Sequence, residues 1–353
     1  MNSAKLEPSE ITAQNPQEAQ GANSRSPTLA TNLTNDFVTR AFYCGFMRLS
    51  AEAEAKLQKF IEQSSFATSG VVITDLDGTA VHEDQGKIVI PKEVELGLMR
   101  HYQRGRPLIL NSLRFPLSVI RTFGQDWYKI SNAPIPTITL NGSLMGYVKK
   151  TDEAELVFEE AAAFPLTKDE VLETLTGVKG ILDRGLKNVL VFYYPRDWRI
   201  GEVIWTPVAE NVDHVKEKYR SASAVTAVEL PKLQEQMLAE EICMIFLLID
   251  VPQDQLMAYQ HTKRSNFITH KGVDKLFGAR VMSDMFKSDL RDSLGAGDTE
   301  LDTFLAGVGL ATLVGNHNLN FNGLIDTIKL NNSLELGMLL FRAAELAADK
   351  THG

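Results

Sequence analysis

The sequence contains little cysteine: Cys44 and Cys243 are its only two in 353 residues, and they lie far apart. Two cysteines this far apart do not form a disulfide framework, and they lack the paired spacing of zinc ligands, so neither feature is predicted. Each is expected to be a small buried apolar residue. Such sparse use of cysteine is typical of the reducing cytosol, so we predict a cytoplasmic protein.

The chain also lacks an excess of basic charge and a long apolar run. Its 36 lysines and arginines against 45 aspartates and glutamates give a net charge of −9, so binding to nucleic acid or to an anionic membrane is not expected. The longest apolar run, Ile242 to Ile249, is too short to cross a bilayer and fits a buried strand. The sequence therefore predicts no nucleic-acid partner and no membrane-spanning segment.

The first 66 residues differ in pattern from the rest. Residues 1–35 are rich in Ser, Asn, Gln, Pro and Ala and have no apolar period, which predicts a disordered segment. Residues 36–66 carry apolar side chains at helical spacing, such as Leu57 and Phe60, with Ser50 at a favourable N-cap position. We therefore predict a helical extension that leads into the main domain.

From residue 70 onward, short apolar runs alternate with helical patterns. The candidate strands are GVVIT, RPLILNS, TITLNG and SLGAG, and the candidate helices are PKEVELGLMRHYQRG, KGVDKLFG and TELDTFLAGVG. This alternation predicts an α/β fold with a Rossmann-like, mostly parallel sheet that helices cover on both faces. Ligands bind at the carboxyl ends of the strands in such sheets.

The stretch GVVITDLDGTAV, residues 70–81, ends a buried strand on two aspartates. Burying unpaired carboxylates is costly, so a cation or a shared proton is expected beside them. One of the two carboxylates could attack a phosphoryl group while the other protonates the leaving oxygen, with Mg²⁺ offsetting the negative charge. Gly78 would allow a sharp turn, and Thr79 could donate hydrogen bonds at the loop.

This DLDGT stretch resembles the first motif, D-x-D-x-T, of the haloacid dehalogenase (HAD) superfamily. Later residues follow that family's order. Ser112 in LILNSLR matches its second motif, with Arg114 two residues on, although sugar phosphatases with a cap often read T-G-R there. Lys271 in THKGVDKLFG resembles the lysine of its third motif.

The run GAGDTELDTFLAG resembles the fourth motif, G-D-x-x-x-D, with Asp298 and Asp302. A helix starting after Asp298 would point both carboxylates to one side, toward a metal. Leu301 is a departure, because many relatives have asparagine there.

The resemblance implies a Mg²⁺-dependent phosphatase with an aspartyl-phosphate intermediate. In it Asp75 is the nucleophile and Asp77 the general acid and base. The implied substrate-binding residues are Thr79, Ser112, Arg114 and Lys271, and the implied metal site comprises Asp75, Asp77 through its backbone carbonyl, Asp298, and Asp302 behind it.

About 120 residues separate TITLNG from THKG, which is too long for a loop. They contain strand patterns such as NVLVFYY and helical patterns such as PKLQEQMLAEE, so a second α/β domain is expected. Its position resembles the large cap of the sugar-phosphatase group that includes sucrose-phosphate phosphatase. We predict a catalytic core of residues 67–142 and 262–353, and a cap of residues 143–261.

The sequence thus predicts a phosphoric monoester hydrolase that acts on a small phosphorylated metabolite of the sugar phosphate type. Two alternatives stay open: a phosphosugar mutase, and a non-catalytic metabolite-binding or scaffold protein on the same fold. Monomer and homodimer are both compatible with the sequence.

Overall fold

The structure is a computed structural model that describes residues 49–84, 87–249, 266–315, 319 and 326–352. The predicted disordered segment 1–35, the first part of the helical extension and Cys44 lie outside these residues. Within them, Cys243 is fully buried, as expected. No helix in the described ranges is both long enough and apolar enough to cross a membrane.

An eight-stranded sheet forms the centre of the fold, in the order β15-β14-β13-β1-β4-β5-β6-β7. Neighbouring strands from β15 to β5 pair in parallel, and β6 and β7 add an antiparallel edge. The strands are β1 Val72–Thr74, β4 Leu108–Asn111, β5 Ile135–Thr139, β6 Leu144–Lys150, β7 Leu156–Ala163, β13 Leu294–Gly297, β14 Leu310–Val314 and β15 Asp326–Leu330.

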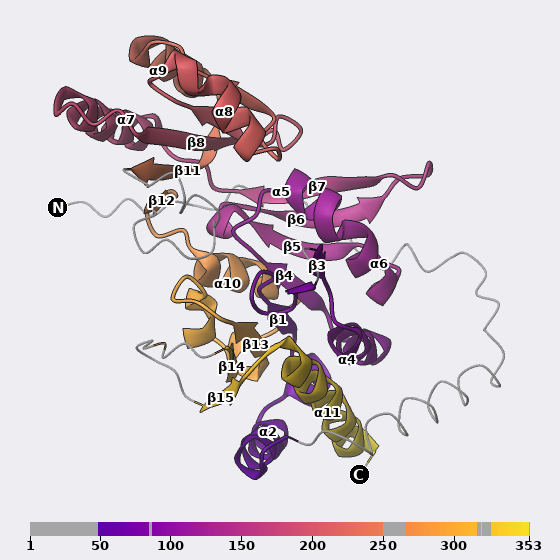
Figure 1. Ribbon diagram of the computed structural model, residues 1–353. Coiled ribbons are helices and arrows are strands. Elements are labelled where there is room, and N and C mark those ends of the chain that lie inside the picture. Colours follow the sequence, from indigo (N-terminus) through magenta and orange to yellow (C-terminus); the bar gives the residue numbers. More distant parts are fainter. Residues whose placement is uncertain (1–48, 85–86, 250–265, 316–318, 320–325, 353) are drawn as a thin grey trace, which may run out of the picture. The chain divides into compact units, whose positions relative to one another are not determined.

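Helices cover both faces of this sheet, which confirms the predicted α/β class (Figure 1). Alternate strand residues point to opposite sides, so Val72 packs in the cluster with α4 and α11 whereas Ile73 packs in the cluster with α10. The helices of this part are α2 Ala51–Gln63, α3 Phe66–Ser69, α4 Lys92–Gln103, α5 Pro116–Val119, α6 Gln125–Ser131, α10 Lys275–Met285 and α11 Ser333–His352, with a π-helix, η2 Ile120–Gly124, between α5 and α6.

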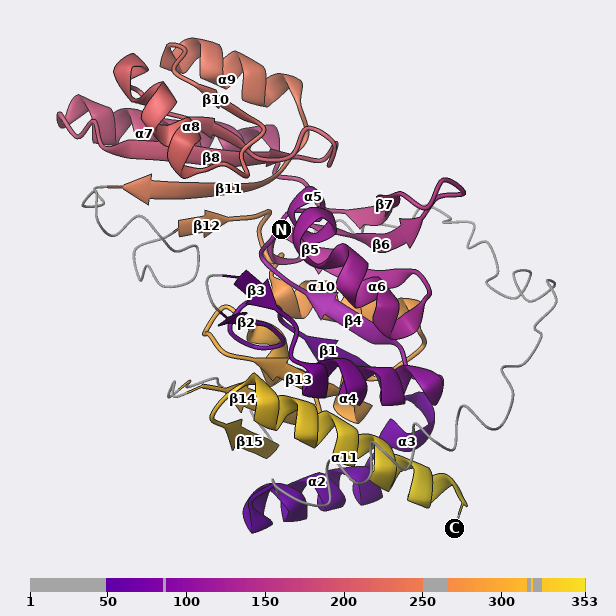
Figure 2. The same cartoon turned by 45° about the vertical axis from the view of Figure 1, so that its right-hand side comes forward.

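A second sheet of five strands, in the order β10-β9-β8-β11-β12, belongs to the long insertion (Figure 2). Side chains of α7 and α9 pack on one of its faces, and side chains of its other face join the main core cluster. Its elements are α7 Lys168–Asp183, β8 Val189–Pro195, β9 Val203–Trp205, α8 Val212–Lys218, β10 Ala224–Thr226, α9 Leu230–Ala239, β11 Ile242–Ile249 and β12 Asn266–Ile268.

The two sheets do not divide at the predicted boundaries of the cap. Residues 144–163, assigned to the cap from the sequence, form β6 and β7 of the main sheet, because β6 pairs with β5 directly after a tight turn. Residues 266–268, assigned to the core, pair with β11 in the second sheet. The change from one sheet to the other therefore comes after Ala163 and again after Ile268.

Short elements complete the fold. A two-stranded hairpin, β2 His82–Asp84 and β3 Lys87–Val89, follows the DLDGT stretch. The 3-10 helices are η3 Leu140–Gly142, η4 Ala209–Asn211, η5 Leu290–Asp292 and η6 Thr303–Ala306.

Candidate functional site

Three adjacent strands bring the predicted polar residues to one edge of the main sheet. Asp75 follows β1, Ser112 follows β4 and Asp298 follows β13, and β1 lies between the other two strands. Because the strands are parallel, their carboxyl ends meet at the same edge, where ligands bind in such sheets.

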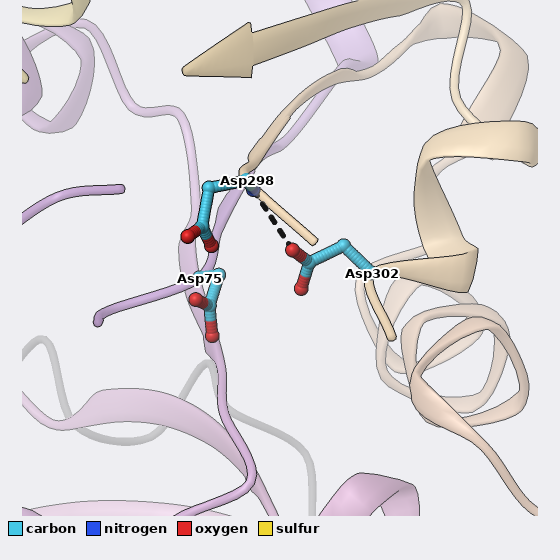
Figure 3. Close-up of side chains that lie close together, drawn as sticks. All are labelled: Asp75, Asp298 and Asp302. Carbon is cyan, nitrogen blue, oxygen red and sulfur yellow. Dashed lines mark hydrogen bonds between the residues drawn. The ribbon is translucent and has the colours of Figure 1, made fainter. Parts of the chain in front are cut away.

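Asp75, Asp298 and Asp302 form a buried acidic cluster there (Figure 3). One ligand atom from each lies within 4.8 Å of the others. Their residues are only 6%, 7% and 0% exposed. Three carboxylates at this depth repel one another and are poorly solvated, so they require a positive charge close by.

The buried cation is Lys275, the first residue of α10. Its Nζ donates to Asp75 Oδ1 at 2.7 Å and to Asp302 Oδ1 at 2.6 Å, and the lysine is itself 2% exposed. The lysine predicted for this position was Lys271, but Lys275 occupies it instead. Lys271 is exposed, four residues before α10 begins, and its backbone N–H donates to Glu170.

The loop after β13 is shaped by Asp302. Its Oδ2 accepts hydrogen bonds from the backbone N–H groups of Asp298 and Thr299, each at 2.9 Å. The expected α-helix after Asp298 does not form, because these bonds fold the chain into a turn that leads into the short helix η6. Leu301 is exposed on this turn. Asp302 therefore orients both the loop and Lys275. The carboxylate of Asp298 does not take part in these bonds and faces Asp75 in the acidic cluster.

Gly78 and Thr79 bring the DLDGT loop against Asp298. Gly78 has a φ of +77°, and a Cβ atom there would lie 2.2 Å from Asp298 Oδ2, so a side chain does not fit. Thr79 is fully buried and its hydroxyl donates to Asp298 Oδ1 at 3.2 Å. Thr79, predicted as a substrate ligand, thus contacts the acidic cluster.

Arg114, also predicted as a substrate ligand, is paired with Asp77. Its Nε donates to Asp77 Oδ2 at 2.6 Å and its Nη2 to Oδ1 at 2.8 Å, a fork that uses both carboxylate oxygens. The backbone N–H of Arg114 donates to the hydroxyl of Ser112, which is buried. Asn111, which the sequence analysis did not single out, donates from Nδ2 to the carbonyl oxygen of Lys275 and ties α10 to the end of β4.

The charges of the cluster shift its pKa values. Burial, followed by the charge of Asp302, raises the pKa of Asp298 to about 7. Burial also raises the pKa of Asp75, although Lys275 opposes this effect. For Lys275 burial alone would lower the pKa, but Asp302 and Asp75 outweigh it and the pKa is raised. The lysine therefore stays charged.

A divalent cation fits this donor set. The residues Asp75 and Asp298 supply carboxylate oxygens, the ligands that Mg²⁺ prefers, and Lys275 alone does not balance the three carboxylates. Asp302 already accepts from Lys275 and from two backbone N–H groups, so it suits a place behind the metal. Asp77 contributes no carboxylate oxygen to this group, because Arg114 holds its side chain.

The second sheet contacts the main domain close to this edge. Phe115, next to Arg114, has its ring 5.6 Å from that of Tyr194 on β8. On the connection back to the core, His270 Nδ1 lies 2.9 Å from Glu170 of α7. Arg196, in the aromatic and basic turn after β8, pairs with Glu160 on β7 and with Glu241. These contacts join the inserted segment to the sheet that carries the site.

No protein-family model and no curated protein sequence matches this chain. Solved structures do match its fold. The HAD subclass IIB sugar phosphatase BT4131 aligns with a TM-score of 0.55 and 15% identity, over 80% of this chain and 98% of that one. BT1666 from Bacteroides thetaiotaomicron, a phosphatase of the same superfamily, has a TM-score of 0.55 and 13% identity, over 86% and 99%.

TM0651 from Thermotoga maritima has a TM-score of 0.52 and 18% identity, over 78% of this chain and 97% of its own. At these identities the likeness shows the fold. The chain has the fold of these HAD phosphatases.

Proposed function

We propose that this protein is a divalent-metal-dependent phosphatase that hydrolyses a small phosphorylated metabolite. One observation carries the proposal: Asp75, at the end of β1, is buried beside Asp298 and is hydrogen-bonded to a buried lysine that also holds Asp302. Phosphoryl transfer depends on placing a nucleophile and neutralising charge, and this cluster supplies both. The HAD fold of phosphatases supports the same chemistry by analogy.

In the proposed reaction Asp75 is the nucleophile. One of its carboxylate oxygens accepts from Lys275, so the other is available to attack phosphorus and form an aspartyl-phosphate. Asp77 gives a proton to the leaving oxygen and later takes one from the water that attacks the phosphoenzyme. Ser112 and Lys275 are the proposed donors to phosphoryl oxygens.

The proposed cofactor is Mg²⁺, held by Asp75 and Asp298. When bound, it would supply positive charge to the phosphoryl oxygens and to the carboxylates. Thr79 keeps Asp298 oriented, and Gly78 lets the two loops approach closely.

A sugar phosphate is the proposed substrate class. BT4131, one of the matched structures, is a sugar phosphatase, and a second domain inserted in the main one offers a surface for the part of a substrate that does not react.

Phosphate release from a panel of phosphorylated sugars and other metabolites, measured with Mg²⁺ and after chelation, tests the proposal. We expect metal-dependent release by the wild type and none by Asp75→Asn. The matched control is Asp126→Asn, an exposed aspartate of α6 that pairs with Lys129, which should stay fully active. No release from any compound by a folded, Mg²⁺-loaded protein would refute the phosphatase, and transfer of the phosphoryl group between sugar positions would indicate a mutase instead.

A further inference from the structure

Arg114 and Asp77 form a two-bond ion pair at the edge of the site. We propose that Arg114 is the positioning residue of Asp77 and not a ligand of the phosphoryl group; this rests on the proposed function. Both oxygens of Asp77 accept from the guanidinium, at 2.6 Å and 2.8 Å. Two parallel hydrogen bonds fix the plane of a carboxylate as well as its place, which a single bond does not.

The guanidinium is braced from its other side. Its Nη1 donates to the hydroxyl of Ser118 at 3.0 Å, and its central carbon lies 4.9 Å from the centre of the Phe123 ring. Ser118 and Phe123 are both buried, on α5 and the π-helix that follows β4. Arg114 is therefore held by the helical segment and in turn holds the carboxylate of Asp77 in place.

This support offsets a repulsion within the site. Asp77 is a further carboxylate two residues after Asp75, and like charges this close repel one another. Without Arg114, Asp77 would turn away from these carboxylates toward solvent. The fork keeps Asp77 beside the nucleophile, where a leaving oxygen would pass.

The two roles for Arg114 predict different dependence on the leaving group. A sugar alkoxide needs a proton as it leaves, whereas p-nitrophenolate leaves without one. If Arg114 acts through Asp77, its loss lowers kcat/KM, which reports formation of the phosphoenzyme, only for substrates that need the proton. The later base role of Asp77 acts on the same phosphoenzyme from either substrate and lowers kcat for both. If Arg114 binds the phosphoryl group, both substrates suffer equally, because they share that group.

The experiment compares kcat and KM for p-nitrophenyl phosphate and for the best sugar phosphate in wild type, Arg114→Lys and Asp77→Asn. We expect Arg114→Lys to lower kcat/KM for the sugar phosphate about 30-fold, a part of the roughly 10²–10⁴-fold that general acid catalysis contributes, with kcat/KM for p-nitrophenyl phosphate changed less than about 3-fold. Asp77→Asn should show the same split, and the double variant should lose little more. Arg121→Lys, an exposed arginine of the π-helix, is the matched control and should behave as wild type.

Ser118→Ala gives a second, milder test, because it removes one brace of the guanidinium and leaves the fork. It should lower kcat/KM for the sugar phosphate by a smaller factor, again with little change for p-nitrophenyl phosphate. Equal losses of kcat/KM on both substrates, or additive losses in the double variant, would overturn the positioning role. A missing split in Asp77→Asn alone would instead refute Asp77 as the acid, and no turnover by wild type would refute the phosphatase itself together with this role.

Discussion

Replacing Lys275 with methionine is expected to lower both stability and activity. Its ammonium group lies 2.7 Å from Asp75 and 2.6 Å from Asp302, and the three side chains are 2%, 8% and 0% exposed. Methionine keeps much of the length but leaves two buried carboxylates without that cation. Removing one partner of a buried ion pair costs about 3–5 kcal/mol, because the remaining charge stays uncompensated.

Urea unfolding and phosphate release measure the two effects. Turnover should fall about 100-fold or more, since a charged donor to the nucleophile and to the phosphoryl group is lost. Adding Asp302→Asn to the variant should recover part of the stability, because it removes one of the uncompensated charges. Without Mg²⁺ the stability difference should be largest.

Lys271→Met is the matched control for this change. The side chain is exposed and its described hydrogen bond runs through the backbone, so stability should change by less than about 0.5 kcal/mol and turnover should not change. A Lys275→Met protein as stable and active as wild type, or a Lys271→Met protein without activity, would show that the assignment of the lysine from the structure is wrong.

Three further changes test the metal site, the DLDGT loop and the contact between Glu170 of α7 and His270. Asp298→Asn should weaken Mg²⁺ binding about tenfold or more, measured by calorimetry as well as by the Mg²⁺ dependence of turnover; unchanged affinity would remove Asp298 from the metal site. Gly78→Ala should destabilise the protein by about 1–2 kcal/mol and reduce turnover, because its Cβ would meet Asp298 at a positive φ, whereas Gly180→Ala in α7, which has open space, should be neutral or stabilising. Burial alone would raise the pKa of Glu170, but hydrogen bonds from His270 and from the backbones of Thr167 and Lys271 lower it from 4.5 to about 2. Its stabilisation is therefore full above pH 4.5 and lost as the pH falls toward 2, so Glu170→Gln should flatten this part of the unfolding profile; an unchanged acid limb would contradict the pairing.

The acidic residues of the site could be located from the sequence because strand ends set their positions. An apolar run that stops at two aspartates marks the end of β1, and a similar run with glycines marks β13. Once the sheet is parallel, both ends lie at one edge, whatever the exact conformation of the loops. Asp75 and Asp298 were therefore brought together by the topology alone.

The lysine could not be located in this way, because a helix start decides which side chain faces the site. The sequence offers two lysines four residues apart, and the K-G pair at 271–272 favours the first. In the structure α10 begins only at Lys275, where Asp274 is the N-cap and accepts from the N–H of Phe277. An aspartate directly before a helical run is a capping signal, and it would have identified Lys275 as the first helical residue.

The boundary of the insertion was misplaced for a related reason. A period-two pattern after TITLNG predicts strands but does not say which sheet they join. The tight turn at η3 returns the chain beside β5, so β6 and β7 extend the main sheet before the second domain begins. The spacing between the motifs gives the length of an insertion. Only the hydrogen bonds between strands show which strand is the first of the inserted domain.

The role of Arg114 shows the same limit at the level of a side chain. Spacing after β4 correctly placed it at the carboxyl edge, where both a substrate phosphate and Asp77 are within reach of a long guanidinium. The choice between them depends on Ser118 and Phe123, which hold the guanidinium from the helical segment that follows. Those contacts form only when α5 and the π-helix pack against the sheet. A strand pattern can thus show at which edge of the sheet a residue lies, but only the packed structure shows its hydrogen-bond partner. The leaving-group experiment tests whether the pairing of Arg114 with Asp77 also governs the reaction.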